Sequence, residues 1–394
     1  MKTIRQIDVR DRKVLVRCDF NVPLDDKGRV SDNFRIKKTL PTIQYLIAKN
    51  AKIILISHLG EPKGKDPKYS LKPVAEELSK LLGQEVKFAG DCIGPEAEKA
   101  VSQMDRRQVL LLENLRFYKE EKENDIEFAK KLSKLADIFI QDGFGVCHRR
   151  HASVVGIPEF LESGAGLLVE REVEVLTKIM EDPARPLVAI IGGAKINTKI
   201  KIIKKFFTKS DHLLLGGKIA NTILAIKGIC VRDPLPAEAE EVLKEVDSIN
   251  LTSPKLHLPI DGVMSLAKLD EKYLRTGAVG TVRRDEEIFD VGPETVESFN
   301  RIIASAKMIV WNGPLGYSEI RPFDKSSLEI AKAIAQSGAF TVIGGGETIE
   351  FVSRVGMLNS FNHVSTGGGA MLDFLSGDVL PGIEILSGNG NGKA

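Results

Sequence analysis

The sequence is poor in cysteine and in aromatic residues. Its 394 residues include four scattered cysteines, no two of which form a CxxC pair, and aromatic residues make up 6%. This pattern favours reduced, buried or half-buried thiols over a disulfide framework. The opening stretch MKTIRQIDVRDRK carries charges where a secretory signal would need an apolar core. We therefore expect a cytoplasmic location.

Long apolar runs and a charge excess of one sign are also absent. No run approaches the roughly 18 apolar residues that a membrane span needs, and 56 Lys+Arg against 54 Asp+Glu leave a net charge of +2. We therefore expect neither a membrane nor a nucleic acid as partner. The hydrophobic fraction of 43% is ample for packed cores, and the length predicts two or three domains.

Two common nucleotide-binding motifs are missing as well. The chain has no GxxxxGK[ST] sequence and no GxGxxG followed by an acidic residue about 20 positions on. These absences exclude the common P-loop machinery and weigh against a dinucleotide-binding Rossmann domain.

Short, uniformly apolar runs alternate with amphipathic stretches along the chain. The runs predict strands at residues 13–17, 52–57, 109–112, 137–141, 187–191, 212–215, 308–311, 340–343 and 363–365, and helical spacing covers residues 71–82, 126–135 and 328–335. Strands without polar alternation are typical of parallel sheets that are covered on both faces. The alternation of strands with helices therefore predicts an α/β fold.

A boundary falls near residue 182, where a helical pattern ends at Glu181-Asp182-Pro183. A single helix between two α/β blocks is typical of a connector. We predict a first domain over residues 1–167, a connecting helix over 168–182 and a second domain over 183–376.

Basic side chains follow the predicted strands of the first domain. The segments after these strands contain Arg17-Cys-Asp19-Phe-Asn21, Ser57-His58, Glu113-Asn-Leu-Arg116 and Asp142 to His151, and Arg35 opens the helix after the first loop. Ligands of open α/β sheets bind beyond the carboxyl ends of the strands, and arginine matches the geometry of phosphate and carboxylate. A small, multiply anionic ligand is therefore expected here.

Glycines follow the predicted strands of the second domain. They occur at residues 192–193, 216–217, 313, 316, 344–346 and 367–369, and Lys195 and Lys199 follow the first pair. Glycines let backbone N–H groups approach phosphates closely, and a following helix adds its positive end. We expect Lys195 and Lys199 to share one face at the start of a helix. A first domain that binds an oxyanion and a second that binds a polyphosphate together predict a phosphotransferase. Such an enzyme is expected to close in order to exclude water.

Nine segments together make the chain resemble the phosphoglycerate kinase family over essentially its whole length. They are RCDFNVPL (17–24), SHLG (57–60), ENLRF (113–117), HRRHAS (148–153), GGAK (192–195), DVGP (290–293), WNGPLG (311–316), GGG (344–346) and STGGGA (365–370). The resemblance implies a hinge-bending kinase with two Rossmann-like parallel-sheet domains joined by a helix, whose segment 377–394 returns to the first domain. It also implies reversible phosphoryl transfer between Mg-ATP and the carboxylate of 3-phosphoglycerate, giving ADP and 1,3-bisphosphoglycerate in glycolysis and gluconeogenesis, by a monomer.

The same resemblance implies roles for individual residues. Those expected to bind phosphoglycerate are Asp19, Asn21, Arg35, His58, Arg116 and Arg149. Those expected at the nucleotide are Gly192, Gly193, Lys195, Lys199, Gly216, Asn312, Pro314, Glu319, Gly344, Gly345, Gly346, Glu347 and Thr348. Gly368 and Gly369 would offer backbone donors, Glu347 would hold Mg²⁺, and Arg35 and Lys195 would be the catalytic residues.

Three positions depart from the family pattern. Glu61 stands where the family usually has arginine, and it should repel an anionic substrate unless it turns outward or pairs with a neighbour such as Arg35. Glu347 stands in place of the usual aspartate, and Lys218 replaces a small or apolar residue. Two alternatives stay open: a kinase of this architecture for another phosphorylated acid, and a non-catalytic nucleotide-binding scaffold.

Overall fold

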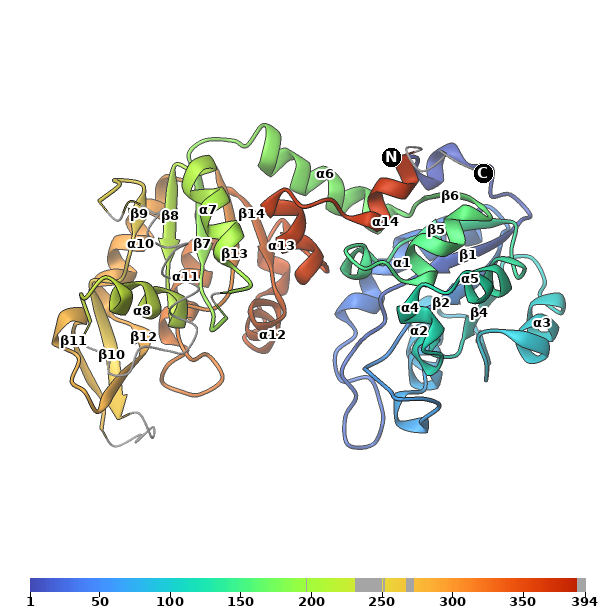
Figure 1. The fold of residues 1–394 in the computed structure, drawn as a ribbon, viewed down its shortest axis with the longest axis horizontal. Helices are drawn as coiled ribbons and strands as arrows, with labels where there is room; N and C mark the ends of the chain where they lie inside the picture. The colour runs from blue at the N-terminus through green and yellow to red at the C-terminus, as the bar shows by residue number, and fades with distance from the viewer. Residues whose placement is uncertain (196, 231–249, 251, 267–272, 388–394) are drawn as a thin grey trace. The chain divides into compact units, whose positions relative to one another are not determined.

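The computed structural model describes residues 1–195, 197–230, 250, 252–266 and 273–387 (Figure 1). The chain divides into two compact units: unit 1 is Met1–Glu174 with Gly377–Ala394, and unit 2 is Val175–Ser376. The boundary lies inside helix α6 (Leu167–Glu181), which begins and ends one residue before the predicted connector. Residues 388–394 of the predicted returning segment lie outside the described part.

Unit 1 is built on a six-stranded parallel sheet in the order β3-β4-β2-β1-β5-β6. In chain order the strands are β1 (Lys13–Arg17), β2 (Lys52–Ile56), β3 (Val86–Ala89), β4 (Val109–Leu112), β5 (Ile138–Gln141) and β6 (Glu162–Ala165). The sequence pattern did not predict β3 and β6. Both are edge strands with partly exposed residues, so they lack a uniformly apolar run.

Successive residues of each central strand face two different hydrophobic clusters. Val14 and Val16 pack with residues of α1 (Phe34–Ala48) and α2 (Lys72–Leu82), whereas Leu15 packs with residues of α3 (Gly94–Ser102) and α5 (Ile126–Ser133). Both faces of the sheet are therefore covered, as the short apolar runs predicted. Unit 1 also contains α4 (Glu120–Glu123) and α14 (Pro381–Glu384).

Unit 2 contains a second six-stranded parallel sheet, in the order β15-β14-β13-β7-β8-β9. Its strands are β7 (Leu187–Ile191), β8 (His212–Leu215), β9 (Leu256–His257), β13 (Met308–Asn312), β14 (Phe340–Gly344) and β15 (His363–Val364). Its helices include α7 (Ile200–Lys209), α8 (Gly217–Ile226), α10 (Pro293–Ser305), α11 (Lys325–Gln336), α12 (Gly346–Arg354) and α13 (Gly369–Ser376). The two sheets confirm the predicted α/β class.

Unit 2 also contains a three-stranded antiparallel sheet, which the sequence pattern did not predict. Its order is β11-β10-β12, with β10 (Asp261–Leu266), β11 (Arg275–Ala278) and β12 (Glu286–Val291). Its strands mix charged and apolar residues, which hides them from a search for uniformly apolar runs. The sheet lies beside α8, which packs against β12 (Figure 1).

The last described residues pack against unit 1. The backbone N–H of Lys2 donates to the carbonyl of Leu386 at 3.0 Å, and that of Gly382 donates to the carbonyl of Cys147 at 2.9 Å. All four cysteines are free and buried. No helix in the described part of the chain is long and apolar enough to cross a bilayer.

The first residue of β10 caps a helix of unit 2. Asp261 accepts hydrogen bonds from the backbone N–H groups of Glu294 at 3.0 Å and Thr295 at 2.8 Å, and from the Thr295 hydroxyl at 2.6 Å. Asp261 is 5% exposed. Since the first N–H groups of a helix have no partner within it, this carboxylate satisfies two of these groups at the start of α10.

We expect Asp261→Ala to lower the free energy of unfolding of unit 2 by about 1–3 kcal/mol, because two N–H groups at the start of α10, one of them buried, lose their acceptor. Trp311, the only tryptophan, is fully buried in unit 2, so its fluorescence reports the urea transition of this unit. The exposed Asp285 is the matched control, and Asp285→Ala should stay within about 0.5 kcal/mol. Equal effects of the two variants would contradict the capping role.

Candidate active site

The loop after β1 and the start of α1 are joined by hydrogen bonds. Arg35, near the start of α1, donates from Nη1 to Asp19 Oδ2 at 3.0 Å and to the Asn21 carbonyl at 3.2 Å. The Asn21 side-chain oxygen accepts from the backbone N–H of Gly60 at 2.9 Å, which ties this loop to the loop after β2. Three predicted substrate-binding residues, Asp19, Asn21 and Arg35, are thus brought together.

Glu61 pairs with neighbouring cations, as one of the two expectations had it, but these are Arg116 and Lys122 rather than Arg35. Its Oε1 lies 2.5 Å from Arg116 Nη1, and its Oε2 lies 3.1 Å from Lys122 Nζ. Burial opposes ionisation of Glu61, but the Lys122 hydrogen bond and the Arg116 charge lower its pKa. Arg35 pairs with Asp19 instead. The two cations that Glu61 contacts come from the loop after β4 and from α4.

His58 and Arg149 complete the predicted basic set. His58 is 3% exposed and lies beside the buried Arg17, whose Nη2 is 3.2 Å from His58 Nδ1. Arg149 is exposed, in the segment after β5. Burial, followed by the charges of Arg116, Arg17 and Arg149, lowers the pKa of His151 to about 4. The loops after β1, β2, β4 and β5 therefore bring the predicted basic side chains together, several of them beside carboxylates.

The ends of β7 and β13 approach each other as closely as only glycine allows. A Cβ on Gly192 would lie 2.1 Å from the Pro314 carbonyl oxygen, and one on Gly313 would lie 2.2 Å from the Gly192 carbonyl oxygen. Gly313 also has a φ of +96°, a backbone conformation that side chains disfavour. The glycines are therefore required by this contact between two strand ends.

A cavity of about 290 Å³ lies at these strand ends. It is lined by nine of the predicted residues: Lys195, Lys199, Asn312, Gly345, Gly346, Glu347, Thr348, Gly368 and Gly369. One prediction was wrong: Lys195 and Lys199 do not lie on the first turns of a helix, because α7 begins at Ile200 with Lys199 as its N-cap. Polar residues such as Thr198 precede the helix. The Thr198 hydroxyl donates to the Lys195 carbonyl at 3.0 Å.

Lys199 is a buried cation in this cavity. It is 8% exposed, and its Nζ donates to the Gly192 carbonyl at 2.8 Å. Burial lowers its pKa to about 8, although the charge of Glu347 acts in the opposite direction. The charge of Glu347 thus offsets only part of the effect of burial on Lys199. An anion in the cavity would stabilise the charged form of this lysine further.

The Asn312 side chain is buried and 1% exposed. Neither its amide nitrogen nor its oxygen has a hydrogen-bond partner among the described residues. Unsatisfied polar groups of this kind are rare in native interiors. Since Asn312 lines the same cavity as the two lysines, its amide is suited to a polar ligand.

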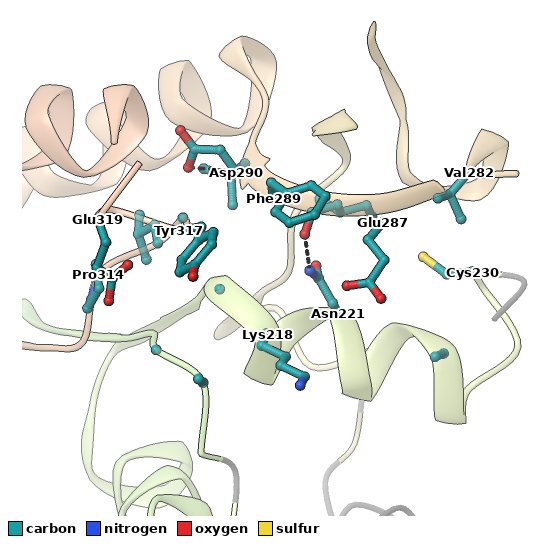
Figure 2. Close-up of a pocket in the computed structure, with 18 of the residues that line it drawn as sticks. Lys218, Asn221, Cys230, Val282, Glu287, Phe289, Asp290, Pro314, Tyr317 and Glu319 are labelled. Atoms are coloured by element: carbon teal, nitrogen blue, oxygen red, sulfur yellow. Dashed lines mark hydrogen bonds between the residues drawn. The ribbon is translucent and has the colours of Figure 1, made fainter. Parts of the chain in front are cut away.

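A larger cavity of about 320 Å³ lies next to α8 and β12 (Figure 2). Pro314, Tyr317 and Glu319 lie at one end, and Val282 and Cys230 at the other. The lining combines apolar side chains with a few polar ones, which is typical of a small-molecule site.

Asn221 and Phe289 line this cavity but carried no signal in the sequence. Asn221 lies on α8 and donates from Nδ2 to the Ile288 carbonyl at 2.9 Å, which joins the helix to β12 (Figure 2). Phe289 belongs to the three-stranded sheet that the pattern missed. Lys218, one of the departures noted in the sequence, lines the cavity and is exposed.

Three predicted nucleotide residues line neither cavity. They are Gly192, Gly216 and Gly344. A Cβ would lie 2.4 Å from Leu315 Cδ2 at Gly216 and 2.1 Å from Met371 Sδ at Gly344, so these glycines permit close packing behind the site. Thr348 accepts from the Gly313 N–H at 2.7 Å and holds the loop after β13.

The donor set of the smaller cavity fits Mg²⁺ only together with a ligand. The described part of the chain contains no cluster of three or more His, Cys, Asp or Glu suited to a metal, whereas Glu347 provides one carboxylate. Mg²⁺ is typically held by one or two carboxylates, water and substrate phosphates. Glu347 is therefore compatible with a metal that arrives with phosphates.

Basic loops on one parallel sheet and a glycine-rich, lysine-bearing cavity on another define the class as an α/β phosphotransferase. The family model for phosphoglycerate kinase matches residues 4–378. The phosphoglycerate kinase of Pelotomaculum thermopropionicum is 43% identical over 389 residues, 98% of each chain. Two solved phosphoglycerate kinases, from Coxiella burnetii (36% identical, TM-score 0.84) and Pyrococcus horikoshii (31%, 0.87), each cover 98% of both chains.

The chain belongs to the phosphoglycerate kinase family. This membership confirms the predicted function, an ATP-dependent phosphotransferase of the phosphoglycerate kinase type. The roles of individual residues stay predictions.

We expect the stability of unit 2 to rise with pH through Lys199. The unfolded lysine keeps its proton up to about pH 10.5, whereas the folded one releases it near pH 8. The unfolded state therefore binds more protons between these values, and stability rises there. Relative to Lys199→Met, the wild type should gain about 2 kcal/mol between pH 8 and pH 10 in urea unfolding followed by Trp311 fluorescence. Parallel pH profiles of the two proteins would contradict the low pKa.

Proposed function

We propose that unit 1 binds 3-phosphoglycerate and that unit 2 binds Mg-ATP, with the γ-phosphoryl group transferred to the substrate carboxylate. The observation that carries this proposal is the Asn312 amide. It is buried without a partner in the described residues, and it lines a cavity together with Lys195 and Lys199. Such a group gains stability when a polar ligand such as a phosphate chain supplies its hydrogen bonds.

The basic loops of unit 1 would hold the acceptor. Arg116 offers a guanidinium that is 9% exposed, and His58 and Arg35 add donors within hydrogen-bonded loops. Charge-assisted hydrogen bonds to phosphate and carboxylate are the strong ones. Asp19 orients Arg35, and Asn21 holds the backbone of Gly60.

The two cavities of unit 2 would divide the nucleotide between them. The larger one suits a base and ribose, with Pro314 as a wall and Glu319 exposed at one end. The smaller one suits the phosphates, with backbone N–H groups at the starts of α12 and α13 near Gly346 and Gly369. Glu347, which lines both, would hold Mg²⁺, and the bound metal would neutralise charge on the phosphates.

The reaction needs no general base, because the acceptor carboxylate is already ionised. Catalysis then rests on positioning and on neutralising charge as the phosphoryl group transfers. Arg35 and Lys195 are the proposed residues for that charge. Lys195 is exposed in the loop before α7 and lines the smaller cavity. Its long side chain would stay in contact with the phosphoryl group during transfer.

Mg²⁺ dependence, a monomeric state and a cytoplasmic location are parts of this proposal that rest on the family resemblance. A coupled assay with ATP, Mg²⁺ and 3-phosphoglycerate tests the proposal as a whole. Nucleotide binding without turnover would indicate a scaffold, and turnover with a different phosphorylated acid would indicate another acceptor.

We expect Lys195→Ala to lower kcat by roughly 10²–10³-fold, because it removes a charge that acts on the transferring group. The KM for ATP should change much less, since other donors also hold the phosphates of ATP in the ground state. The control is Lys307→Ala, an exposed lysine before the amino end of β13, which should keep wild-type kinetics. Normal turnover with only weaker ATP binding would remove Lys195 from the catalytic step.

We expect Glu61→Gln to lower the KM for 3-phosphoglycerate by about 2- to 5-fold. The substrate no longer has to displace a carboxylate from Arg116, and an ion pair with one exposed partner contributes about 0.5–1 kcal/mol. Glu61→Arg should lower this KM as well, and the KM for ATP should stay unchanged in both. Kinetics are compared at one ionic strength.

Glu123→Gln is the matched control for Glu61→Gln. Glu123 lies on α4 and faces Lys119 at 3.9 Å, with both side chains exposed, so its loss should leave both KM values unchanged. A higher KM for 3-phosphoglycerate in Glu61→Gln would instead show that Glu61 orients Arg116 for the substrate.

A further inference from the structure

Arg17, the last residue of β1, is a fully buried arginine beneath the basic loops of unit 1. Its Nε donates to the Ser153 hydroxyl at 2.7 Å, and its Nη1 donates to the Cys18 carbonyl. Its Nη2 lies 3.2 Å from His58 Nδ1. Each nitrogen of the guanidinium thus has a partner, so its orientation is closely defined.

A buried carboxylate stabilises this arrangement. Glu121 is fully buried and accepts from the Ser153 hydroxyl at 2.5 Å and from the Ser153 N–H at 2.9 Å. Its Oε1 lies 3.9 Å from Arg17 Nη2 and also 3.9 Å from His151 Nδ1. Ser153 therefore donates to Glu121 while it accepts from Arg17, which leaves only one arrangement of its proton.

The contact with Arg17 determines the tautomer of His58. A guanidinium has only donors and stays protonated in proteins. His58 Nδ1 must therefore accept, so it carries no proton. A neutral imidazole keeps its single proton on the other nitrogen. The hydrogen bond of the His58 ring to the described residues is made at Nδ1, so Nε2–H stays available to a ligand.

The surroundings also keep His58 neutral. Burial comes first, and the charges of Arg17, Arg116 and Arg35 add to it; together they hold the pKa of His58 well below its ordinary value. The nearby carboxylates do not offset this, because Asp19 pairs with Arg35 and Glu121 is engaged with Ser153. His58 is thus an N–H donor without charge in a cluster of cations.

We infer that Arg17 is a positioning residue that holds His58 in the Nε2–H tautomer, so that His58 offers a bound oxyanion a neutral N–H donor. Arg17 itself is buried beneath the site and acts through His58. The inference deepens the proposed function, on which the identity of the oxyanion as 3-phosphoglycerate rests. The tautomer can be tested without any substrate.

Long-range ¹H–¹⁵N correlation spectra of ¹⁵N-histidine-labelled protein test the tautomer directly. The chain has six histidines, and the His58→Gln spectrum assigns the signals of His58 by their loss. We expect a δ1 nitrogen without a proton and an ε2 nitrogen with one, unchanged from pH 6 to pH 8. The opposite tautomer, or an imidazolium that titrates in this range, would overturn the inference.

Substrate kinetics test the consequence for binding. His58→Ala should raise the KM for 3-phosphoglycerate about tenfold, and His58→Gln should recover most of that loss, because its amide can accept from Arg17 and donate to the substrate. The ratio of KM values between His58→Gln and the wild type should stay constant from pH 6 to pH 8, which cancels titration of the substrate. A ratio that falls as the pH rises would show that His58 binds as a cation.

A double-mutant cycle tests whether Arg17 acts through His58. Arg17→Lys should raise the KM for 3-phosphoglycerate several-fold in the wild type and clearly less in His58→Ala, whereas equal increases would overturn the positioning role. Arg12→Lys, an exposed arginine just before β1, is the control and should change neither. If the chain did not act on 3-phosphoglycerate, the proposed function would fail while the spectra would still decide the tautomer.

Discussion

Hydrophobic cover on both faces of each parallel sheet is the constraint on which the site depends. In unit 1, neighbouring residues of β1 pack into two separate clusters, so neither face can carry polar chemistry. Within the sheets, the charged and polar side chains that can form a site therefore lie at the points where the chain leaves the strands. In unit 1 these points carry arginine and histidine, and in unit 2 they carry glycine and lysine.

Each unit holds a buried cation at its strand ends, and the two cations differ in character. Arg17 is fully buried and keeps its charge because a guanidinium does not release its proton in proteins. Lys199 donates to a backbone carbonyl, and burial lowers its pKa to about 8, so its charge responds to its surroundings. Unit 1 thus has a permanent charge beneath its binding loops, whereas the charge in unit 2 is strengthened by an anion.

Carboxylates act as internal counterions in both units. Glu61 occupies Arg116, a proposed substrate contact, and Glu347 raises the pKa of Lys199 against the effect of burial. A counterion stabilises the unliganded site and competes with an anionic ligand. Glu61, which departs from the family pattern, is therefore expected to affect the strength of substrate binding rather than the fold.

Local patterns in the chain were enough to predict the central strands, the fold class and the residue types at the strand ends, because strand periodicity and burial on both faces leave a direct trace in composition. The partner of Glu61 could not be predicted, since Arg116 lies 55 positions away. The same holds for the tautomer of His58 and for the cavity beside Asn221 and Phe289. These features arise from contacts between distant segments, and a pattern within a short window carries no information about which distant groups meet.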